Sequence, residues 1–138
     1  MAESPRAIDT NVLLRYLLND VRDQSERARR LVESDLAIGL TVVVLAELAW
    51  TLAGSRYREE RTSVASCLAK LLSRDNIVAV GFDKAEAQAA LMACARPTGA
   101  PSFGDALIAA CARSAGLSEI YTFDQHFARA GLVPVSPT

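Results

Sequence analysis

The sequence predicts an α/β fold in which a central parallel sheet is covered by helices on both faces. Short apolar segments alternate along the chain with longer segments whose apolar residues recur at helical spacing. Strands that alternate with helices favour parallel pairing through right-handed crossovers. The chain has 138 residues, of which 51% are hydrophobic, and this is the usual size and composition of one domain with its own core. Residues 1–138 are therefore expected to form a single domain.

The first elements are expected on either side of a polar turn. Residues 6–8 are short and apolar and predict a strand, which ends in the turn 9–11. Apolar side chains at helical spacing within residues 12–17 predict the helix that follows. Residues 23–34 predict a second helix, because charged residues occupy one face and Ala, Leu and Val occupy the other.

The next segment predicts a strand and two helices. Residues 36–38 are expected to be the strand, and Thr41 is a favourable N-cap for a helix that ends near Gly54. The β-branched run 42–44 also suits a strand, so the start of this helix stays open. A further helix is expected at residues 59–73.

The second half of the chain repeats the alternation. Residues 77–80 have the composition most typical of a strand, and a helix is expected at 83–95. Pro and Gly residues make 96–101 a loop, and a largely apolar helix begins after Ser102. The remaining expected elements are a strand at 119–122, a short helix at 124–130 and an edge strand at 132–135, where proline is tolerated.

Composition excludes several classes of protein. No apolar run is long enough to cross a bilayer, and the N-terminus lacks the pattern of a secretory signal, so a cytoplasmic protein with no membrane partner is expected. The single histidine, His126, argues against a zinc site and against a serine or cysteine triad. Cys67, Cys94 and Cys111 form no C-x-x-C pair and lie in apolar segments, so they are expected to be reduced core residues.

Net charge leaves binding to nucleic acid open. The formal charge of −1 argues against a general electrostatic attraction to phosphate. Neutralising four of the 16 acidic residues with bound metal would leave 12 of them against 15 basic residues. Thirteen of the basic residues are arginines, whose planar guanidinium can bind two phosphate oxygens at once.

Two acidic residues follow expected strands. Asp9 comes directly after the first strand and Asp124 comes shortly after the strand that contains Thr122. Ligands of open α/β sheets bind beyond the carboxyl ends of the strands, so both positions suit a functional site. Each acid also precedes an expected helix, and an N-terminal cap explains either of them equally well.

Two further acids lie in expected helices. Asp105 falls within Ser102-Phe103-Gly104-Asp105, which matches a capping box, and an acid in the first helical turn is also held in its ionised form. Glu47 lies in mid-helix among apolar residues, with no Lys or Arg within one turn, and a carboxylate in such surroundings needs a partner. The alternative for Glu47 is a surface position on an otherwise apolar helix.

Asp9, Glu47, Asp105 and Asp124 together predict a metal site. Carboxylates without His or Cys form an all-oxygen site, which selects Mg²⁺ or Mn²⁺ over zinc. The matching chemistry is hydrolysis of a phosphodiester by an activated water, with one metal ion or with two ions roughly 3.5 to 4 Å apart.

Four motifs around these acids resemble a known family. They are Ile8-Asp9-Thr10-Asn11, Val44-Leu45-Ala46-Glu47-Leu48-Ala49-Trp50, Phe103-Gly104-Asp105 and Tyr121-Thr122-Phe123-Asp124. In order and spacing they resemble the PIN-domain ribonucleases, and within that family the VapC-type toxins of bacterial toxin–antitoxin pairs. The resemblance implies a three-layer α/β/α domain with a central parallel sheet, and it assigns the four acids to a catalytic Mg²⁺ or Mn²⁺ site.

The resemblance also implies supporting residues and one departure from the family. Thr10, Asn11 and Thr122 are expected to orient carboxylates, water or phosphate. Many relatives carry a further Asp three residues before the third acid, where this chain has Ser102. A site of five carboxylates is therefore in doubt, although four acids suffice for the chemistry.

Substrate and partners follow from the resemblance alone. The implied substrate is structured RNA, such as a tRNA or rRNA loop, and the implied partners are a cognate antitoxin protein and a second copy of the chain. Trp50 and Tyr57 are candidate anchors for the antitoxin, and the alternative for Trp50 is a core position. The candidate RNA contacts, each of which is otherwise an ordinary solvated arginine, are Arg15, Arg56, Arg58 and Arg61.

Two rival functions remain in view. A phosphatase with an aspartyl nucleophile would use Asp9, but such enzymes commonly carry a second Asp where this chain has Asn11. A receiver-like signalling domain without enzymatic activity would use Asp83 as phosphoacceptor beside Lys84. Asp83 is better explained as a helix cap, and a receiver domain leaves Glu47 and Asp105 without a role.

Overall fold

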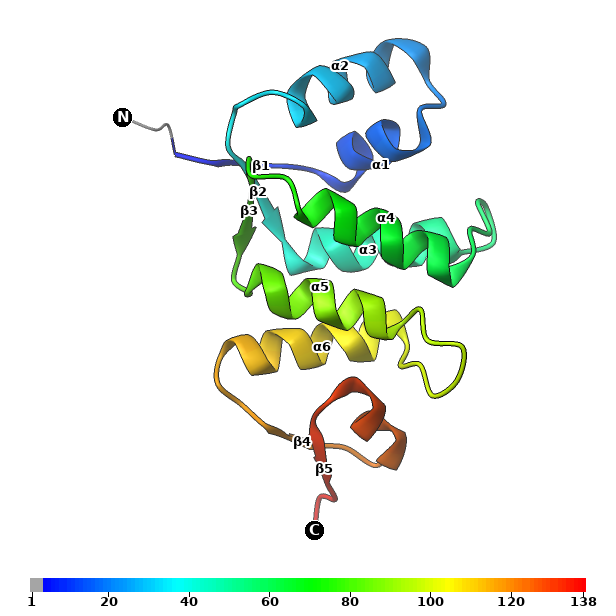
Figure 1. The fold of residues 1–138 in the computed structure, drawn as a ribbon, viewed down its shortest axis with the longest axis vertical. Helices are drawn as coiled ribbons and strands as arrows, with labels where there is room; N and C mark the ends of the chain where they lie inside the picture. Colours follow the sequence, from blue (N-terminus) through cyan, green and yellow to red (C-terminus); the bar gives the residue numbers. More distant parts are fainter. Residues whose placement is uncertain (1–3) are drawn as a thin grey trace.

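The computed structural model describes residues 4–138, which fold into helices that pack around parallel strands (Figure 1). The strands in this part of the chain are β1 (Arg6–Ala7), β2 (Ile38–Thr41), β3 (Ile77–Val80), β4 (Glu119–Tyr121) and β5 (Val133–Val135). The helices are α1 (Thr10–Leu18), α2 (Arg22–Val32), α3 (Val42–Ala53), α4 (Arg61–Leu72), α5 (Lys84–Ala93), α6 (Phe103–Ser114) and the 3-10 helix η1 (Gln125–Ala130).

Side-chain caps set the starts of several helices where the sequence predicts them. The hydroxyl of Thr41 accepts a hydrogen bond from the Val44 amide at 3.4 Å, and Asp83 Oδ1 accepts one from the Glu86 amide at 3.1 Å. The β-branched run 42–44 is therefore helical. The cap at Thr41 and the buried leucines of α3 outweigh the preference of valine for strands.

The strands pair in parallel, as expected. β1, β2 and β3 form a three-stranded sheet in which Arg6 pairs with Ile38 and Ile38 pairs with Ile77. β2 begins at Ile38, two residues later than predicted, and the Leu36 side chain is 53% exposed. In Figure 1, α1 and α2 lie at the upper end of the molecule and α3 to α6 are stacked below them. This layered α/β/α arrangement with parallel strands confirms the predicted fold class.

The parallel strands do not form one continuous sheet. β4 pairs with β5, with Glu119 opposite Val133, and these two strands make a separate two-stranded sheet. They lie beyond α6 at the lower end of Figure 1. Between these two strands, Phe127 and Leu132 are buried with Ala109 of α6 in a small apolar cluster of their own. Within residues 4–138, β1 and β4 are therefore not paired with each other.

The main core lies between the three-stranded sheet and the helices. Its fully buried side chains include Leu13, Leu40, Leu45, Leu48 and Leu68. The three cysteines are free: Cys94 is buried, whereas Cys67 and Cys111 are only half-buried. Burial raises the pKa of the Cys94 thiol to about 11, so this group is a neutral core residue at ordinary pH.

Within residues 4–138, no helix is both long enough and apolar enough to cross a membrane.

Candidate active site

The first two candidate acids are linked through one residue where α1 packs against α3. Asp9 is the exposed N-cap of α1, and its carboxylate accepts a hydrogen bond from the Thr10 amide at 2.8 Å. Thr10 is buried, and its hydroxyl donates a long hydrogen bond of 3.3 Å to Oε2 of Glu47. Thr10 thus links the residue at the start of α1 to a carboxylate in the middle of α3. This geometry suits the supporting role that was predicted for Thr10.

Glu47 is exposed, so burial of its charge is not the reason to consider it as a metal ligand. The prediction placed it among apolar neighbours, where an unpaired charge is strongly unfavourable. Those neighbours are themselves exposed: the Val43 side chain is 62% and the Trp50 side chain 60% accessible. The carboxylate of Glu47 is therefore in contact with solvent, and a cation can reach it directly.

Asp105 lies half-buried in the first turn of α6, which packs against α3. Ser102 Oγ accepts a hydrogen bond from the Asp105 amide at 3.1 Å, so Ser102 caps this helix. This is one half of the predicted capping box, and it leaves the carboxylate of Asp105 available. Ser102, the position at which the family resemblance implied a further acid, uses its hydroxyl to begin the helix.

Asp124 is exposed and caps η1. Its Oδ1 accepts a hydrogen bond from the His126 amide at 2.9 Å, and Nδ1 of His126 lies 3.7 Å from the same oxygen. The Asp124 amide donates to the hydroxyl of Thr122 at 3.0 Å. Thr122 therefore fixes the backbone of Asp124.

The four acids are not gathered into one cluster. Among residues 4–138, no three side chains of the types His, Cys, Asp and Glu lie close enough together to hold a metal ion. Asp9 and Glu47 are linked through Thr10, whereas Asp124 follows β4 and caps η1, in the segment beyond α6. The strands that precede Asp9 and Asp124 belong to different sheets and are not paired with each other.

The chemistry of these residues nevertheless fits a divalent cation. Carboxylate oxygens are the ligands that Mg²⁺ and Mn²⁺ prefer. In the described part of the chain, the ion pairs with Lys or Arg involve none of Asp9, Glu47, Asp105 and Asp124. Their negative charges are thus not neutralised by basic side chains. They remain available for a metal ion.

Arg15 is already engaged within the protein. Its Nη1 donates to both carboxylate oxygens of Asp20, at 2.8 and 2.9 Å, and its Nη2 donates to the Tyr57 hydroxyl at 3.4 Å. The hydrogen bond with Tyr57 and the charge of Asp20 raise the pKa of Arg15, against the opposing effect of burial. Arg15 holds the end of α1 to the segment after α3, and this contact competes with the predicted binding of phosphate.

The other candidate arginines lie on the surface after α3. The guanidinium of Arg56 stacks over the Tyr57 ring at 5.3 Å from its centroid, and Nε of Arg58 donates to the Ser55 carbonyl at 3.1 Å. Arg61 begins α4 and is exposed. All three arginines are exposed. Tyr57 is half-buried between Arg15 and Arg56, and is less suited to anchor a partner than was predicted.

Sequence reasoning missed an apolar groove beside the acids. The groove has a volume of about 420 Å³ and lies between α3 and α6. Trp50 lines it, and the exposure of this indole shows that a core position for Trp50 is wrong. The signal was present in α3, whose apolar residues surround the helix when only one face is needed for the core. The other lining residues are Val42, Val43, Ala46, Gly104, Leu107, Ile108 and Cys111.

Parallel strands between helical layers, with exposed acids at the starts of two elements, define an α/β protein with an acidic candidate site. Comparison with known protein families matches the PIN domain over residues 7–132. The chain therefore belongs to the PIN domain family, whose members are generally metal-dependent nucleases. No curated protein and no solved structure matches this chain.

Proposed function

We propose that this protein is a Mg²⁺- or Mn²⁺-dependent endoribonuclease of the VapC toxin type, which acts on structured RNA in the cytoplasm and is neutralised by a cognate antitoxin. The observation that carries the proposal is the link from Asp9 through Thr10 to Glu47, which joins the first two family motifs in space. The family match over residues 7–132 supports the nuclease class. Residues 1–138 form the single catalytic domain of this proposal.

In this proposal the four acids hold the metal. Asp9, Glu47, Asp105 and Asp124 supply only carboxylate oxygens, and their net negative charge attracts the cation. When bound, Mg²⁺ or Mn²⁺ lowers the pKa of water and stabilises the charge that develops on phosphate oxygens. Asp124 contributes to this set from the N-cap position of η1, in the segment after β4.

The remaining polar residues of the motifs orient the ligands and the substrate. Thr10 fixes one oxygen of Glu47, and Thr122 fixes the backbone of Asp124. Asn11 is exposed in the first turn of α1, next to these groups in sequence, where its amide suits a water or a phosphate oxygen. Arg56, Arg58 and Arg61 provide the positive surface along which RNA lies.

The proposed partners use apolar surface. The antitoxin places an apolar segment in a groove between helices, and the exposure of Trp50 between α3 and α6 supports its role as an anchor. A homodimer is part of the proposal through the family alone.

The rival functions have weaker support. Asp83, which a receiver-like domain would phosphorylate, caps α5 by accepting the Glu86 amide. The ammonium of Lys84 donates to the Arg74 carbonyl at 2.9 Å and serves the chain itself. The PIN domain match also favours a nuclease over an aspartyl-nucleophile phosphatase.

Metal removal provides the direct test. Purified protein is expected to cleave structured RNA in the presence of Mg²⁺ or Mn²⁺ and to stop when EDTA removes the metal, because the acids alone do not activate water. Sequencing of new 5′ ends in a panel of cellular RNAs would identify the substrate. Cleavage that continues at full rate in EDTA would refute the metal-dependent mechanism.

Replacing Glu47 by glutamine tests the metal site without RNA. The change removes the charge and keeps the shape, so the affinity for Mn²⁺ is expected to fall about tenfold or more in a calorimetric titration. Glu26→Gln is the matched control, since Glu26 is an exposed glutamate on α2, away from the motifs. Equal Mn²⁺ affinity in the Glu47 variant and the wild type would reassign Glu47 to the ordinary surface.

A further inference from the structure

The segment that carries Asp124 is attached to the rest of the protein by few contacts. We call residues 119–135, which contain β4, η1 and β5, the C-terminal unit. Its apolar contact with α6 is small, and alanines form much of it. Apolar contacts are not directional, so they leave the orientation of η1 weakly defined. The buried residues of this contact are Ala109, Phe127, Ala130 and Leu132.

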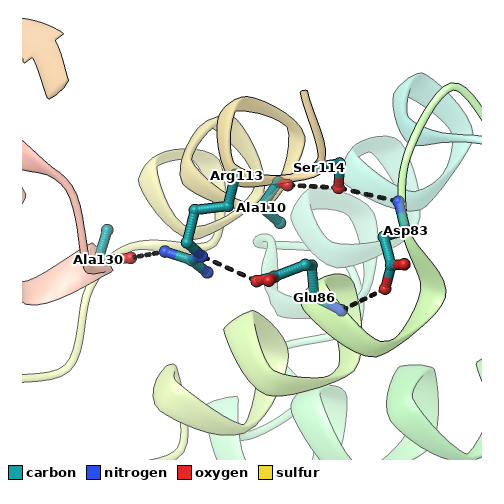
Figure 2. A network of polar contacts seen from close by, with 6 residues as sticks. All are labelled: Asp83, Glu86, Ala110, Arg113, Ser114 and Ala130. Atoms are coloured by element: carbon teal, nitrogen blue, oxygen red, sulfur yellow. Dashed lines mark hydrogen bonds and ion pairs between the residues drawn. The ribbon is translucent and has the colours of Figure 1, made fainter. Parts of the chain in front are cut away.

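Arg113 supplies the directional contact that the apolar cluster lacks. Figure 2 shows its guanidinium between α5 and the end of η1: Nε donates to Oε2 of Glu86 at 2.8 Å, and Nη1 donates to the Ala130 carbonyl at 2.7 Å. The Arg113 side chain is only 25% exposed. Two short bonds from one rigid plane fix the end of η1 relative to both α5 and α6.

The anchor for Arg113 is itself fixed. Asp83 accepts the amide of Glu86 and holds the first turn of α5. The amide of Asp83 in turn donates to the Ser114 hydroxyl at 2.8 Å, which donates to the Ala110 carbonyl at 2.7 Å (Figure 2). The start of α5 is thus tied to the end of α6. Glu86 therefore presents its carboxylate to Arg113 from a rigid position.

Gly131 lets the chain pass close to the guanidinium. Its φ is +89°, a left-handed conformation that favours glycine, and a Cβ at this position would lie 2.7 Å from Nη1 of Arg113. A side chain here would displace the group that holds the Ala130 carbonyl. The contact of Arg113 with the Ala130 carbonyl thus depends on the absence of a side chain at Gly131.

We infer that Arg113 is a positioning residue that sets the orientation of the C-terminal unit and, through it, of Asp124. η1 is a short helix that Asp124 caps at one end and Arg113 holds at the other, through Ala130. Fixing one end of such an element restricts the direction of the other end. The consequence for metal binding rests on the proposed function, whereas the attachment of the unit does not.

Hydrogen exchange tests the attachment. In Arg113→Met, which keeps the apolar stem, the backbone amides of residues 119–135 are expected to exchange about tenfold faster, while those of α1 to α4 stay unchanged. Arg129→Met is the matched control, because Arg129 is an exposed arginine in the last turn of η1. Equal exchange of the C-terminal unit in Arg113→Met and the wild type would overturn the inference.

Two glycine variants test the contact from the opposite side. Gly116 also has a positive φ, of +80°, but no atom lies within 4 Å of its Cβ position. Gly131→Ala is therefore expected to speed exchange in the C-terminal unit more than Gly116→Ala does, because only the former displaces Arg113. In the Arg113→Met background this difference should disappear. A difference of the same size in both backgrounds would contradict the contact.

Metal affinity separates positioning from general support. Arg113→Met is expected to weaken Mn²⁺ binding severalfold in the wild-type background and to have no further effect when Asp124 is already asparagine, since it acts through that residue. Additive losses in the double variant would refute a role through Asp124. If the wild type binds no Mn²⁺, the proposed function fails and the inference fails with respect to the metal site, while exchange still decides the attachment.

Discussion

Replacing Asp9 by asparagine is expected to lower the rate of RNA cleavage by about a hundredfold or more while the protein stays folded. Asp9 caps α1 through a bond that its side-chain oxygen accepts from the Thr10 amide. Asparagine caps helices as well as aspartate does, so the start of α1 should be preserved. It carries no negative charge, however, and is a much weaker ligand for a hard cation. The loss is measured by single-turnover cleavage at saturating Mn²⁺, with circular dichroism as the check on folding.

The matched control for this change is Asp83→Asn. Asp83 is also an exposed aspartate that caps a helix, but it lies at the start of α5, outside the family motifs. The control should cleave RNA at close to the wild-type rate. Undiminished cleavage by folded Asp9→Asn protein would show that Asp9 is not part of the site. A similar loss of cleavage in both variants would mean that the loss comes from weaker capping of a helix and not from a missing metal ligand.

Truncating Leu48 to alanine is expected to lower the free energy of unfolding by about 3 kcal/mol, within the range of about 2 to 5 kcal/mol for buried leucines. Leu48 is fully buried in the main core, directly after Glu47 on α3. The truncation removes apolar contacts and leaves a cavity that the neighbouring leucines fill only in part. Urea denaturation followed by circular dichroism gives the change in unfolding free energy.

Val43→Ala on the same helix is the comparison for Leu48→Ala. The Val43 side chain is 62% exposed, so its truncation should change the unfolding free energy by less than about 1 kcal/mol. Similar losses of unfolding free energy in the two variants would mean that α3 does not bury the face that carries Leu48. Together with Glu47→Gln, this pair separates the stabilising face of α3 from the face assigned to metal binding.

The local elements of the fold were predictable because their signals are local. Thr41, Asp83 and Ser102 each cap the helix that the sequence assigned to them. β3 runs from Ile77 to Val80, as its β-branched composition predicts. Each of these signals acts within about one turn of helix or one strand, so it can be read without knowledge of the remaining chain.

The pairing of distant strands was not predictable in the same way. Alternation of strands and helices favours parallel pairs, and every pair in the described sheets is parallel. β4 pairs with β5 and not with β1, and Phe127 and Leu132, which lie between β4 and β5 in sequence, pack against Ala109 of α6. That packing joins residues from separate elements, and the spacing of apolar residues does not encode it.

The sequence identified residues of the candidate site better than it predicted how exposed their surroundings are. The motifs placed Asp9, Thr10 and Glu47 together, and the structure joins these three residues by hydrogen bonds. The prediction of buried surroundings for Glu47 was wrong. Apolar residues that are neighbours in sequence do not by themselves show that another helix or strand covers them. The sequence made Arg15 a candidate RNA contact and did not reveal its hydrogen bonds to Asp20. These bonds form where the chain turns at Asn19, which has a left-handed conformation.

The division of the strands into two sheets has a consequence for the conformational entropy that folding loses. In the larger sheet Arg6 pairs with Ile38 and Ile38 with Ile77, so each pairing closes a long loop of chain. In the smaller sheet Glu119 pairs with Val133 across a much shorter loop. Closing a shorter loop loses less conformational entropy and takes less time. The C-terminal pair therefore closes at a smaller cost in conformational entropy than either pair of the larger sheet, and its apolar residues then depend on α6 for their burial.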